Sequence, residues 1–530
     1  MLFRSRLMLS LDVYAEVLRT EELEGWDGFG LAIQSYLKMA GGVIDVLVAL
    51  AREPRHRLPV RLVKGAYWDS EVKHAQEEGF PGYPVFTRKA NTDVSYIACA
   101  RKMLAHRAEF YPQFATHNAH TIAVISELAG DRLDFEFQRL HGMGEDLYGE
   151  VLAHANFNGA CRVYAPVGSH EDLLPYLVRR LLENGANTSF VNRIVDDKLP
   201  IDQVVEDPVA KVRATRPVPH PSIPLPVQLY GAERRNSMGR NLANEAGARA
   251  LAAEMGQWAE HQWQARPLLG SSLKVPSGGE TERVVNPANN QDTVGEVKLS
   301  VAADIEQALA EAHRYQVTWD GVPASERAAA LERAASQLED NMPQFMVLLT
   351  REAGKTLEDG IAEIREAVDF LRYYAYQARI GFEHARELPG PTGERNELSL
   401  HGRGVFVCIS PWNFPLAIFL GQVSAALAAG NTVIAKPAEA TPLVAYRAVE
   451  LLHEAGIPRA ALQLLPGYGK EVGDVLMADR RVAGVAFTGS TLTARHINLA
   501  LARREGPLAT LIAETGGQNA MLVDSSALPE

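Results

Sequence analysis

Short apolar runs of strand length alternate with helical patterns over the first 195 residues. The runs cover residues 29–34, 59–65, 114–118, 135–140 and 161–164. Such runs, ending in polar side chains and separated by helical stretches, are typical of parallel strands. Repeated strand–helix units predict a (β/α)8 barrel, whose site lies at the carboxyl ends of its strands. Fewer than eight strands are visible, so we expect only part of a barrel here.

A second strand–helix–strand pattern lies in the other half of the chain. Strand, helix and strand are predicted at residues 405–409, 416–429 and 432–435, with Gly430 and Asn431 ending the helix. This is the pattern of a βαβ unit in a Rossmann-like parallel sheet. Ligands bind such sheets beyond the carboxyl ends of the strands, where Asn413, Lys436 and Glu439 fall.

These three residues suit a defined chemistry. Asn413 lies between two prolines and two aromatic residues, which would hold its amide as a fixed donor for a developing oxyanion. The ammonium of Lys436 and the carboxylate of Glu439 suit two hydroxyls of a ribose. Each residue taken alone is equally explained as a turn asparagine or a solvated charge.

A helix predicted from Ser169 to Gly185 carries neighbouring arginines. Its polar face combines Tyr176, Arg179, Arg180 and Glu183 at helical spacing. Two guanidinium groups suit a carboxylate ligand, which they bind with paired hydrogen bonds. The alternative is a solvated face with an Arg179–Glu183 ion pair.

The remaining patterns set the domain boundaries. Residues 200–231 are proline-rich without apolar periodicity and predict an extended connector. Helices are predicted at residues 241–263 and, as several amphipathic segments, at 302–385. We therefore divide the chain into a barrel at 1–195, a linker and helical connector at 196–270, and a dinucleotide-binding domain at 271–530. Gly489 and Ser490 follow an apolar run, at a turn whose backbone amides suit a pyrophosphate.

Composition excludes some functions. The net charge of −12 argues against a nucleic-acid surface in this region, and no apolar run reaches the length of a membrane span. The three cysteines, Cys99, Cys161 and Cys408, have no metal-ligand spacing. We expect each to be a free, buried thiol, with no metal site and a cytoplasmic location.

Four motifs of the second half together resemble the aldehyde dehydrogenase superfamily. They are PWNFP (411–415), KPAE (436–439), FTGS (487–490) and ETGG (514–517). The resemblance implies that Asn413 lines an oxyanion hole and that Glu514 activates water. It also implies an NAD site formed by Trp412, Lys436, Glu439, Gly489 and Ser490. The nucleophile of the family is a cysteine beyond the glutamate, and Cys408 matches no nucleophile motif.

The first half resembles proline dehydrogenase. The motifs include RLVKGAYWD (61–69), FATHN (114–118) and YLVRRLLENGANTSFVNR (176–193). The resemblance implies that Arg179 and Arg180 bind the proline carboxylate, that Tyr164 and Tyr176 pack over the substrate, and that Tyr67 lies behind them. The residues implied to hold FAD are Gln34, Arg61, Lys64, Gly65, Trp68, His117 and Glu183. His117 alone also suits a metal or a general base, but no second ligand stands at metal spacing.

The two halves in one chain resemble the proline utilization A family. The resemblance implies FAD-dependent oxidation of L-proline to Δ1-pyrroline-5-carboxylate, then NAD-dependent oxidation of glutamate semialdehyde to L-glutamate. It also implies homo-oligomers and a quinone acceptor at the inner membrane face. A barrel lysine and aspartate are expected before this region, so we interpret Met1 as a truncated start. Because no cysteine follows Glu514 in these 530 residues, they alone should form no NADH from the aldehyde. The rival hypothesis is an inactive scaffold that retains FAD and NAD pockets.

Overall fold

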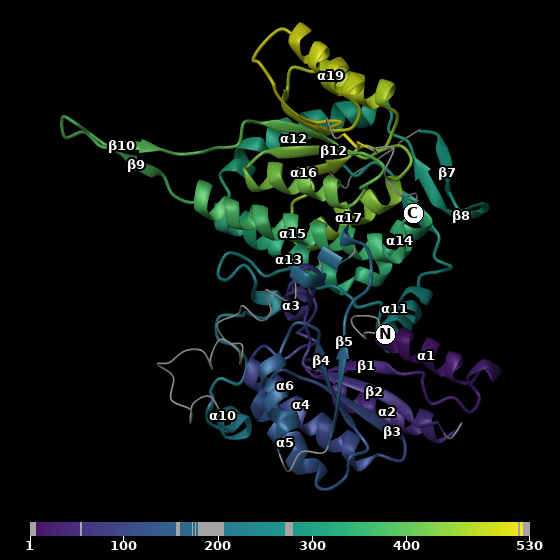
Figure 1. The fold of residues 1–530 in the computed structure, drawn as a ribbon. Coiled ribbons are helices and arrows are strands. Elements are labelled where there is room, and N and C mark those ends of the chain that lie inside the picture. Colours follow the sequence, from purple (N-terminus) through teal and green to yellow (C-terminus); the bar gives the residue numbers. More distant parts are fainter. Residues whose placement is uncertain are drawn as a thin grey trace. The chain divides into compact units, whose positions relative to one another are not determined.

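The protein consists of two compact units. The computed structural model describes residues 7–53, 56–154, 159–171, 173–174, 176–178, 206–270, 279–517 and 520–522. Unit 1 comprises residues 1–229 and 241–247, and unit 2 comprises residues 230–240 and 248–530. Each unit has its own five-stranded sheet (Figure 1).

The sheet of unit 1 is parallel and follows chain order, which confirms the predicted barrel-type pattern. Its strands are β1 (Leu31–Gln34), β2 (Leu58–Val63), β3 (Phe110–Ala115), β4 (Glu136–Leu140) and β5 (Ala160–Tyr164). β3 begins earlier than predicted. Buried and half-buried residues alternate along it, so Tyr111 and Gln113 belong to the strand although they interrupt its apolar run.

Helices connect these strands, and further helices precede β1 and follow β5. They are α1 (Leu7–Leu18), α2 (Ala40–Arg52), α3 (Trp68–Glu77), α4 (Lys89–Ala105), α5 (Ala119–Ala129), α6 (Glu145–Ala153) and α10 (Pro208–Ala214), with short 3₁₀ turns η1 (Glu21–Leu23) and η2 (Pro226–Gln228). Phe114, Phe137 and Tyr148 are buried in the core with Ile44 and Leu47. Burial on this scale is the main force that holds the strand ends in place.

The main sheet of unit 2 is also parallel, but it does not follow chain order: further strands are added on both sides of β11. The order is β13 (Leu462–Leu464), β12 (Thr432–Lys436), β11 (Val405–Ile409), β14 (Val482–Thr488) and β15 (Thr510–Glu514). The predicted βαβ unit is confirmed, with α16 (Ala417–Ala428) between β11 and β12. The strand order reverses between β11 and β14, which is the usual place for a ligand crevice in a doubly wound sheet.

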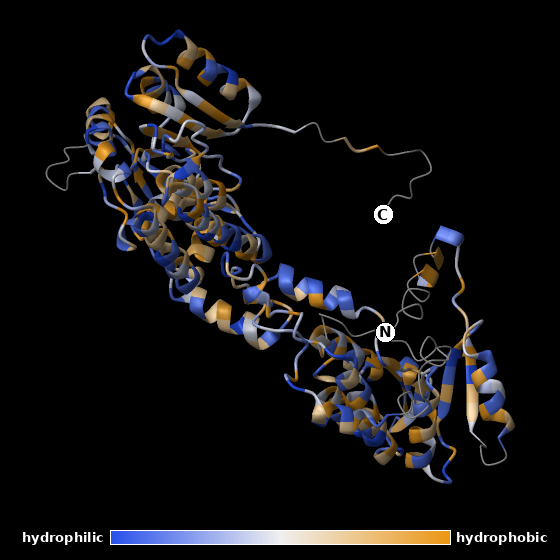
Figure 2. Ribbon diagram, turned by 90° about the vertical axis from the view of Figure 1, so that its left-hand side faces the viewer, coloured by the Kyte–Doolittle hydropathy of each residue, from blue (hydrophilic) through white to orange (hydrophobic). Residues whose placement is uncertain are grey.

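Amphipathic helices surround this sheet, and hydrophobic and hydrophilic residues alternate along them (Figure 2). The helices are α11 (Glu245–Gly256), α12 (Ala302–Asp320), α13 (Ala324–Asp340), α14 (Met342–Arg351), α15 (Leu357–Phe382), α17 (Pro442–Glu454), α18 (Asp474–Ala478) and α19 (Thr491–Arg503), with the π-helical turn η3 (Gly469–Gly473). The helix predicted at 241–263 is shorter than expected. Trp263 instead begins a strand, because its buried side chain stacks on Trp258.

Two smaller sheets complete unit 2. One contains β6 (Trp263–Ala265), β7 (Thr281–Asn286) and β8 (Asn289–Lys298), and the other is the hairpin β9 (Arg386–Leu388) and β10 (Asn396–Leu398). Across the described residues, no helix combines the length and the apolar character needed to cross a bilayer.

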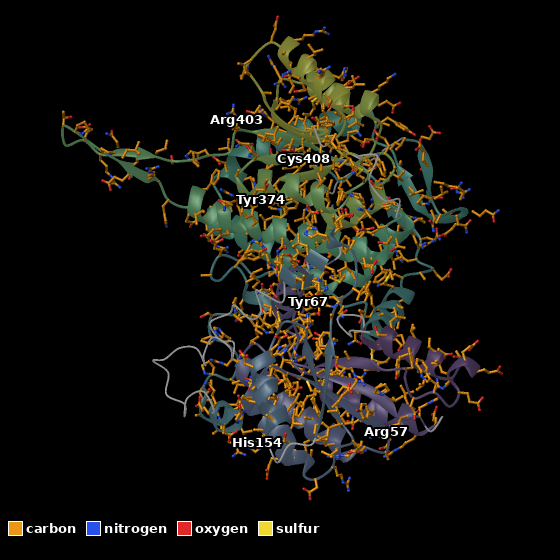
Figure 3. All side chains as sticks on the ribbon, viewed as in Figure 1. Arg57, Tyr67, His154, Tyr374, Arg403 and Cys408 are labelled. Atoms are coloured by element: carbon orange, nitrogen blue, oxygen red, sulfur yellow. The ribbon has the colours of Figure 1, made fainter. Side chains whose placement is uncertain are left out.

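The prediction for the cysteines holds only in part. Cys99 and Cys408 are buried, and Figure 3 labels Cys408. Cys161 is only half-buried, because it lies on β5, the last strand of its sheet among the described residues, where neighbouring positions are exposed.

Candidate active sites

In unit 1, predicted flavin residues gather at the carboxyl ends of β1 and β2. Gln34 is the last residue of β1 and is 1% exposed. Lys64 and Gly65 directly follow β2, and Lys64 forms an ion pair with Asp93 of α4. Since β1 and β2 are parallel neighbours, these side chains lie at one edge of the sheet.

Gly65 occupies a position that no other residue fits without strain. Its φ is +121°, in the region that favours glycine, and a Cβ there would lie 1.5 Å from the ring of Tyr36. The next residues, Tyr67 and Trp68, begin α3, and Trp68 Nε1 donates a 2.7 Å hydrogen bond to the carbonyl of Phe86. The sequence KGAYW therefore places the Trp68 side chain by a tight turn and a single directed bond.

Arg61 combines a stacked guanidinium with an unused donor. Its guanidinium carbon lies 4.1 Å from the centre of the ring of Tyr164. Tyr164 is the last residue of β5. The Nε atom is buried and has no hydrogen-bond partner within the described part of the chain. A buried donor without a partner is costly. An acceptor on a bound cofactor would satisfy it, so this residue fits the FAD site that the resemblance implies.

The Nε2 atom of His117 accepts a hydrogen bond from the backbone N–H of Leu140 at 3.4 Å. Burial lowers the pKa of His117, and the positive charges of Arg139 and Arg61 lower it further. Within the described residues, no group of three or more histidine, cysteine, aspartate or glutamate side chains is arranged to hold a metal ion.

Sequence reasoning missed a polar network on the inner strands of unit 1. Glu136 is 2% exposed and accepts hydrogen bonds from Gln113, Gln138 and both donors of Arg162. Burial opposes ionisation of Glu136, but the bonds from Arg162 and Gln138 outweigh it and lower the pKa. The signal was present as polar residues at alternate positions of adjacent strands, which share one face of a sheet.

The predicted carboxylate-binding helix is described only in part. Residues 176–178 are helical, and Tyr176 belongs to this stretch. Arg179, Arg180 and Glu183 lie outside the described residues, so their predicted roles remain predictions.

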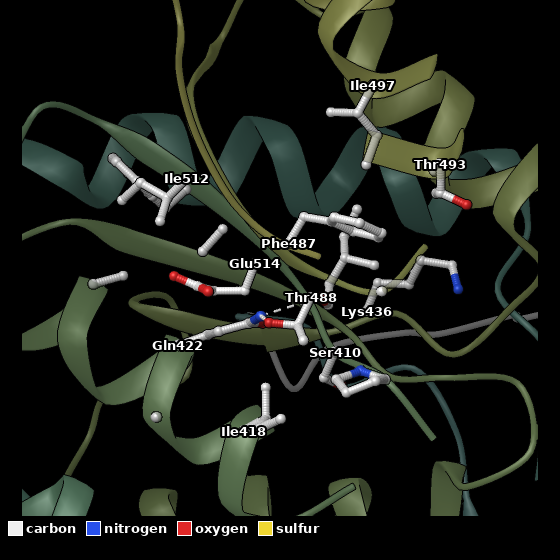
Figure 4. A pocket seen from close by; sticks show the side chains of 18 of the residues that line it. Ser410, Ile418, Gln422, Lys436, Phe487, Thr488, Thr493, Ile497, Ile512 and Glu514 are labelled. Carbon is white, nitrogen blue, oxygen red and sulfur yellow. Dashed lines mark hydrogen bonds between the residues drawn. The ribbon is translucent and has the colours of Figure 1, made fainter. Parts of the chain in front are cut away.

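In unit 2, seven residues singled out from the sequence line one cavity, and Figure 4 labels two of them, Lys436 and Glu514. The cavity includes the carboxyl ends of β11, β12, β14 and β15 and extends along the sheet to Asn431 and Thr510, at the amino ends of β12 and β15. The seven residues are Trp412, Asn413, Lys436, Glu439, Gly489, Ser490 and Glu514. They lie at or just beyond the carboxyl ends of four strands, so only the folded sheet brings them together.

Lys436 and Glu439 are paired with each other. Lys436 ends β12 and is 3% exposed, and its Nζ lies 3.0 Å from Oε1 of Glu439. The same oxygen accepts a hydrogen bond from the Gly469 N–H at 3.0 Å. Burial works against ionisation of Glu439, but the charge of Lys436 outweighs it and lowers the pKa. The pair thus presents a fixed ammonium and carboxylate to one side of the cavity.

The turn between β14 and α19 is constrained by three contacts. Ser490 caps α19, its hydroxyl accepting from the Thr493 N–H. A Cβ on Gly489 would lie 2.6 Å from the Phe487 ring. The Gly489 N–H donates to the carbonyl of Glu514 at 3.1 Å, so an anion at this helix N-terminus would be bound by amides later in the first turn.

Gln422 of α16 was also missed by sequence reasoning. Its Nε2 donates to the carbonyl of Ile409 at 3.2 Å and to the hydroxyl of Thr488 at 3.0 Å (Figure 4). Because the Ile409 carbonyl can only accept, the amide nitrogen must face it. Oε1 is buried and has no partner among the described residues. The cavity thus offers a buried acceptor, which fits a bound group that carries hydrogen-bond donors.

Asn413 and Glu514 are exposed at the mouth of this cavity. The loop that carries Asn413 is supported from behind by Glu363 of α15, whose carboxylate accepts from the N–H groups of Leu416 and Ala417 at 2.8 and 3.3 Å. Such a carboxylate satisfies the first turn of α16 and complements its dipole.

Cys408 cannot act as a nucleophile from its observed position. It lies inside β11 with no exposed surface, and burial raises its pKa to about 12. The thiolate, the reactive form, is therefore suppressed.

Comparison with known proteins finds a family match for most of each unit. Residues 4–193 match the proline dehydrogenase family, and residues 274–528 match the aldehyde dehydrogenase family. The chain is 53% identical over 540 residues to the bifunctional protein PutA of Klebsiella aerogenes, and 49% identical over 531 residues to that of Rhizobium meliloti. These alignments cover 99% of this chain but only 40% and 42% of the relatives.

A solved structure agrees with these matches. The crystal structure of Bradyrhizobium japonicum proline utilization A (PutA) superimposes with a TM-score of 0.86 at 50% identity, covering 97% of this chain and 49% of that one. The chain thus joins a segment that matches the proline dehydrogenase family to one that matches the aldehyde dehydrogenase family. It is similar to these PutA relatives over nearly its whole length and spans less than half the length of theirs.

Proposed function

We propose that unit 1 oxidises L-proline to Δ1-pyrroline-5-carboxylate with FAD, and that unit 2 binds NAD for oxidation of glutamate semialdehyde to L-glutamate. The observation that carries the proposal is the convergence of seven motif residues from the carboxyl ends of four strands on one cavity. The family matches of both segments support it.

In unit 1, the protein's own contribution is binding and orientation. Bound FAD would supply the acceptor for the hydride that leaves proline. Arg61 and Lys64 offer positive charge and donors at the ends of the strands, and Gly65 leaves room for the Tyr36 ring beside this turn. Arg179 and Arg180 are proposed to hold the substrate carboxylate by paired hydrogen bonds, with Tyr164 and Tyr176 covering its ring.

In unit 2, the two ends of the cavity have different tasks. Lys436 and Glu439 would hold the ribose hydroxyls of NAD, which supplies the hydride acceptor when bound, and the first turn of α19 would hold its diphosphate. Asn413 donates to the oxygen of the reacting carbonyl, and Glu514 takes a proton from the water that releases the acid. The burial of Cys408 excludes it as the attacking thiolate.

Two assays test the proposal on a full-length protein that contains this region. Proline should reduce a redox dye in the presence of FAD, and Arg180→Met should raise the KM for proline by orders of magnitude while FAD stays bound. Calorimetry should show that NAD binds to unit 2, where we propose that Trp412 contacts it. Binding of both cofactors without proline-dependent dye reduction would instead support an inactive scaffold. A ubiquinone analogue in place of the dye tests the quinone acceptor, and light scattering tests the homo-oligomer.

A further inference from the structure

The proline-rich linker does not hang free of unit 1. Residues 217–225 lie against the segment 83–88, and Arg88 forms the centre of the contact. Its Nε donates to the carbonyls of Val218 and Pro219, and its Nη2 donates to that of Pro217, each at 3.1 Å. One guanidinium thus binds three successive carbonyls, with charge-assisted hydrogen bonds.

Further contacts extend this attachment along the linker, which we call the docked linker (residues 217–225). The His220 N–H donates to the Thr87 hydroxyl at 3.0 Å. The Tyr83 hydroxyl donates to the Pro224 carbonyl at 2.5 Å and itself accepts from Gln76. Polar anchors at both ends therefore fix the docked linker in one register.

An apolar anchor lies between these polar ones. Ile223 packs against a buried cluster consisting of Tyr36, Leu37, Val72, Ala75, Tyr83 and Val85, to which Trp68 and Phe80 also contribute. Removal of an aliphatic side chain from such a contact usually costs binding energy in proportion to the area it buries.

The segment under the docked linker is tied directly to the proposed flavin residues. The Phe86 carbonyl accepts from Trp68 Nε1 at 2.7 Å, and the Phe86 N–H donates to the Tyr36 carbonyl at 2.9 Å. The Lys38 N–H donates to the Pro84 carbonyl at 2.9 Å. Tyr36 in turn packs on Gly65 and lies two residues after Gln34.

We propose that the docked linker is a positioning element of the flavin site, with Arg88 as its main positioning residue. By holding residues 83–88 it fixes Trp68 and Tyr36, and through them the turn at Lys64 and Gly65. The inference rests on the proposed FAD site of unit 1, but it concerns a segment that no motif of that site includes. The ligand it serves is a flavin nucleotide, and the docked linker acts on it only through these residues.

Thermodynamic linkage gives this proposal a reciprocal signature. If the docked linker favours FAD binding, bound FAD must favour the docked state by the same factor. FAD should therefore slow backbone hydrogen exchange in the docked linker, and the slowing should vanish in a variant that cannot dock.

The test compares Arg88→Ala with Arg52→Ala in the full chain. Arg52 is likewise an arginine with a charge-assisted hydrogen bond, to Glu109, but it lies at an exposed position of α2. We expect Arg88→Ala to raise the FAD dissociation constant at least ~10-fold, in line with the loss of charge-assisted bonds, and Arg52→Ala to leave it unchanged. FAD affinity is measured by quenching of flavin fluorescence, and exchange in residues 217–225 by mass spectrometry.

Ile223→Ala separates positioning from a direct contact of Arg88 with FAD, because Ile223 carries no charge and packs on the Tyr36 cluster. It should weaken FAD binding and lose the exchange response, as Arg88→Ala does. The proposal would be overturned if Ile223→Ala binds FAD with unchanged affinity. It would also be overturned if hydrogen exchange in residues 217–225 of the unmodified protein does not change when FAD is added. Absence of FAD binding by the unmodified protein would instead contradict the proposed function itself. If Arg88→Ala fails to fold, Ile223→Ala and Tyr83→Phe carry the test.

Discussion

The ammonium of Lys355 lies 4.1 Å from the centre of the Phe414 ring, next to Asn413 at the cavity of unit 2. The same ammonium is 3.0 Å from Glu363, whose side chain is fully buried and holds the first turn of α16. Lys355 therefore supports the Asn413 loop on both sides, by a cation–π contact and by neutralising the carboxylate beneath it.

Lys355→Met should destabilise unit 2 by about 3 kcal/mol, because it leaves the Glu363 carboxylate buried without its counter-charge. The change is measured by urea unfolding together with hydrogen exchange of the Leu416 and Ala417 amides. Adding Glu363→Gln in the same chain should recover part of the loss, since the buried charge is then gone. Equal stability of Lys355→Met and the unmodified protein would show that this ion pair contributes nothing.

Replacing both Lys436 and Glu439 with alanine should weaken NAD binding by about 1–3 kcal/mol, because charged hydrogen bonds to the ribose are lost. Isothermal calorimetry measures this. The matched control is Lys73→Ala with Glu77→Ala, an exposed lysine–glutamate pair of α3. An unchanged NAD titration in the first variant would place the dinucleotide elsewhere.

Glu352 should make unit 2 less stable as the pH rises. It accepts hydrogen bonds from the N–H groups of Leu443 and Val444 at 2.7 and 2.8 Å. Burial raises the pKa of Glu352 to about 8, and the two N–H groups limit the rise. The folded state thus keeps a proton that the unfolded chain loses near pH 4.3. The stabilisation is complete below that pH and is lost as the pH rises to about 8.

Glu352→Gln removes this titration, so its melting temperature should fall less than that of the unmodified protein between pH 5 and pH 8. Differential scanning calorimetry across this range measures the difference. Glu450→Gln, at a partly exposed position of α17, serves as the control and should keep the original slope. Parallel curves for all three proteins would mean that Glu352 is ionised in the folded state.

Thiol labelling should distinguish the three cysteines. Cys161 is half-buried and should react with iodoacetamide in the native protein, whereas Cys99 and Cys408 should react only as fast as their surroundings open. Peptide mass spectrometry over a time course measures the order. Rapid labelling of Cys408 would make it a candidate nucleophile again.

The sequence predicts features that depend on neighbouring residues, and the structure adds those that depend on residues far apart in the sequence. Asn413, Lys436 and Glu439 were predicted because local strand and helix patterns place them at a sheet edge. Glu363 and Gln422 were not, since their roles depend on partners far away in the sequence: Glu363 binds amides 53 and 54 residues away, and Gln422 binds Thr488 across the β11–β14 switch.

The linker shows the same limit. Its prolines predict an extended backbone, and the short turns observed around Ile223 and at η2 do not form a core element. Composition alone cannot reveal that Arg88, about 130 residues earlier, binds its carbonyls. Carbonyl groups are present at every residue, so a site made from them leaves no trace in the side-chain pattern.

The hydrogen bond from the Gly489 N–H to the Glu514 carbonyl has a practical consequence for protein engineering. The glycine turn and the proposed water-activating residue share one main-chain bond, so neither can be redesigned alone. Loop grafts that retune coenzyme preference at residues 489–490 would also move the backbone of Glu514 and slow acid release. Changes around Gly469, whose N–H donates to the Glu439 carboxylate, alter the ribose end and leave that coupling intact.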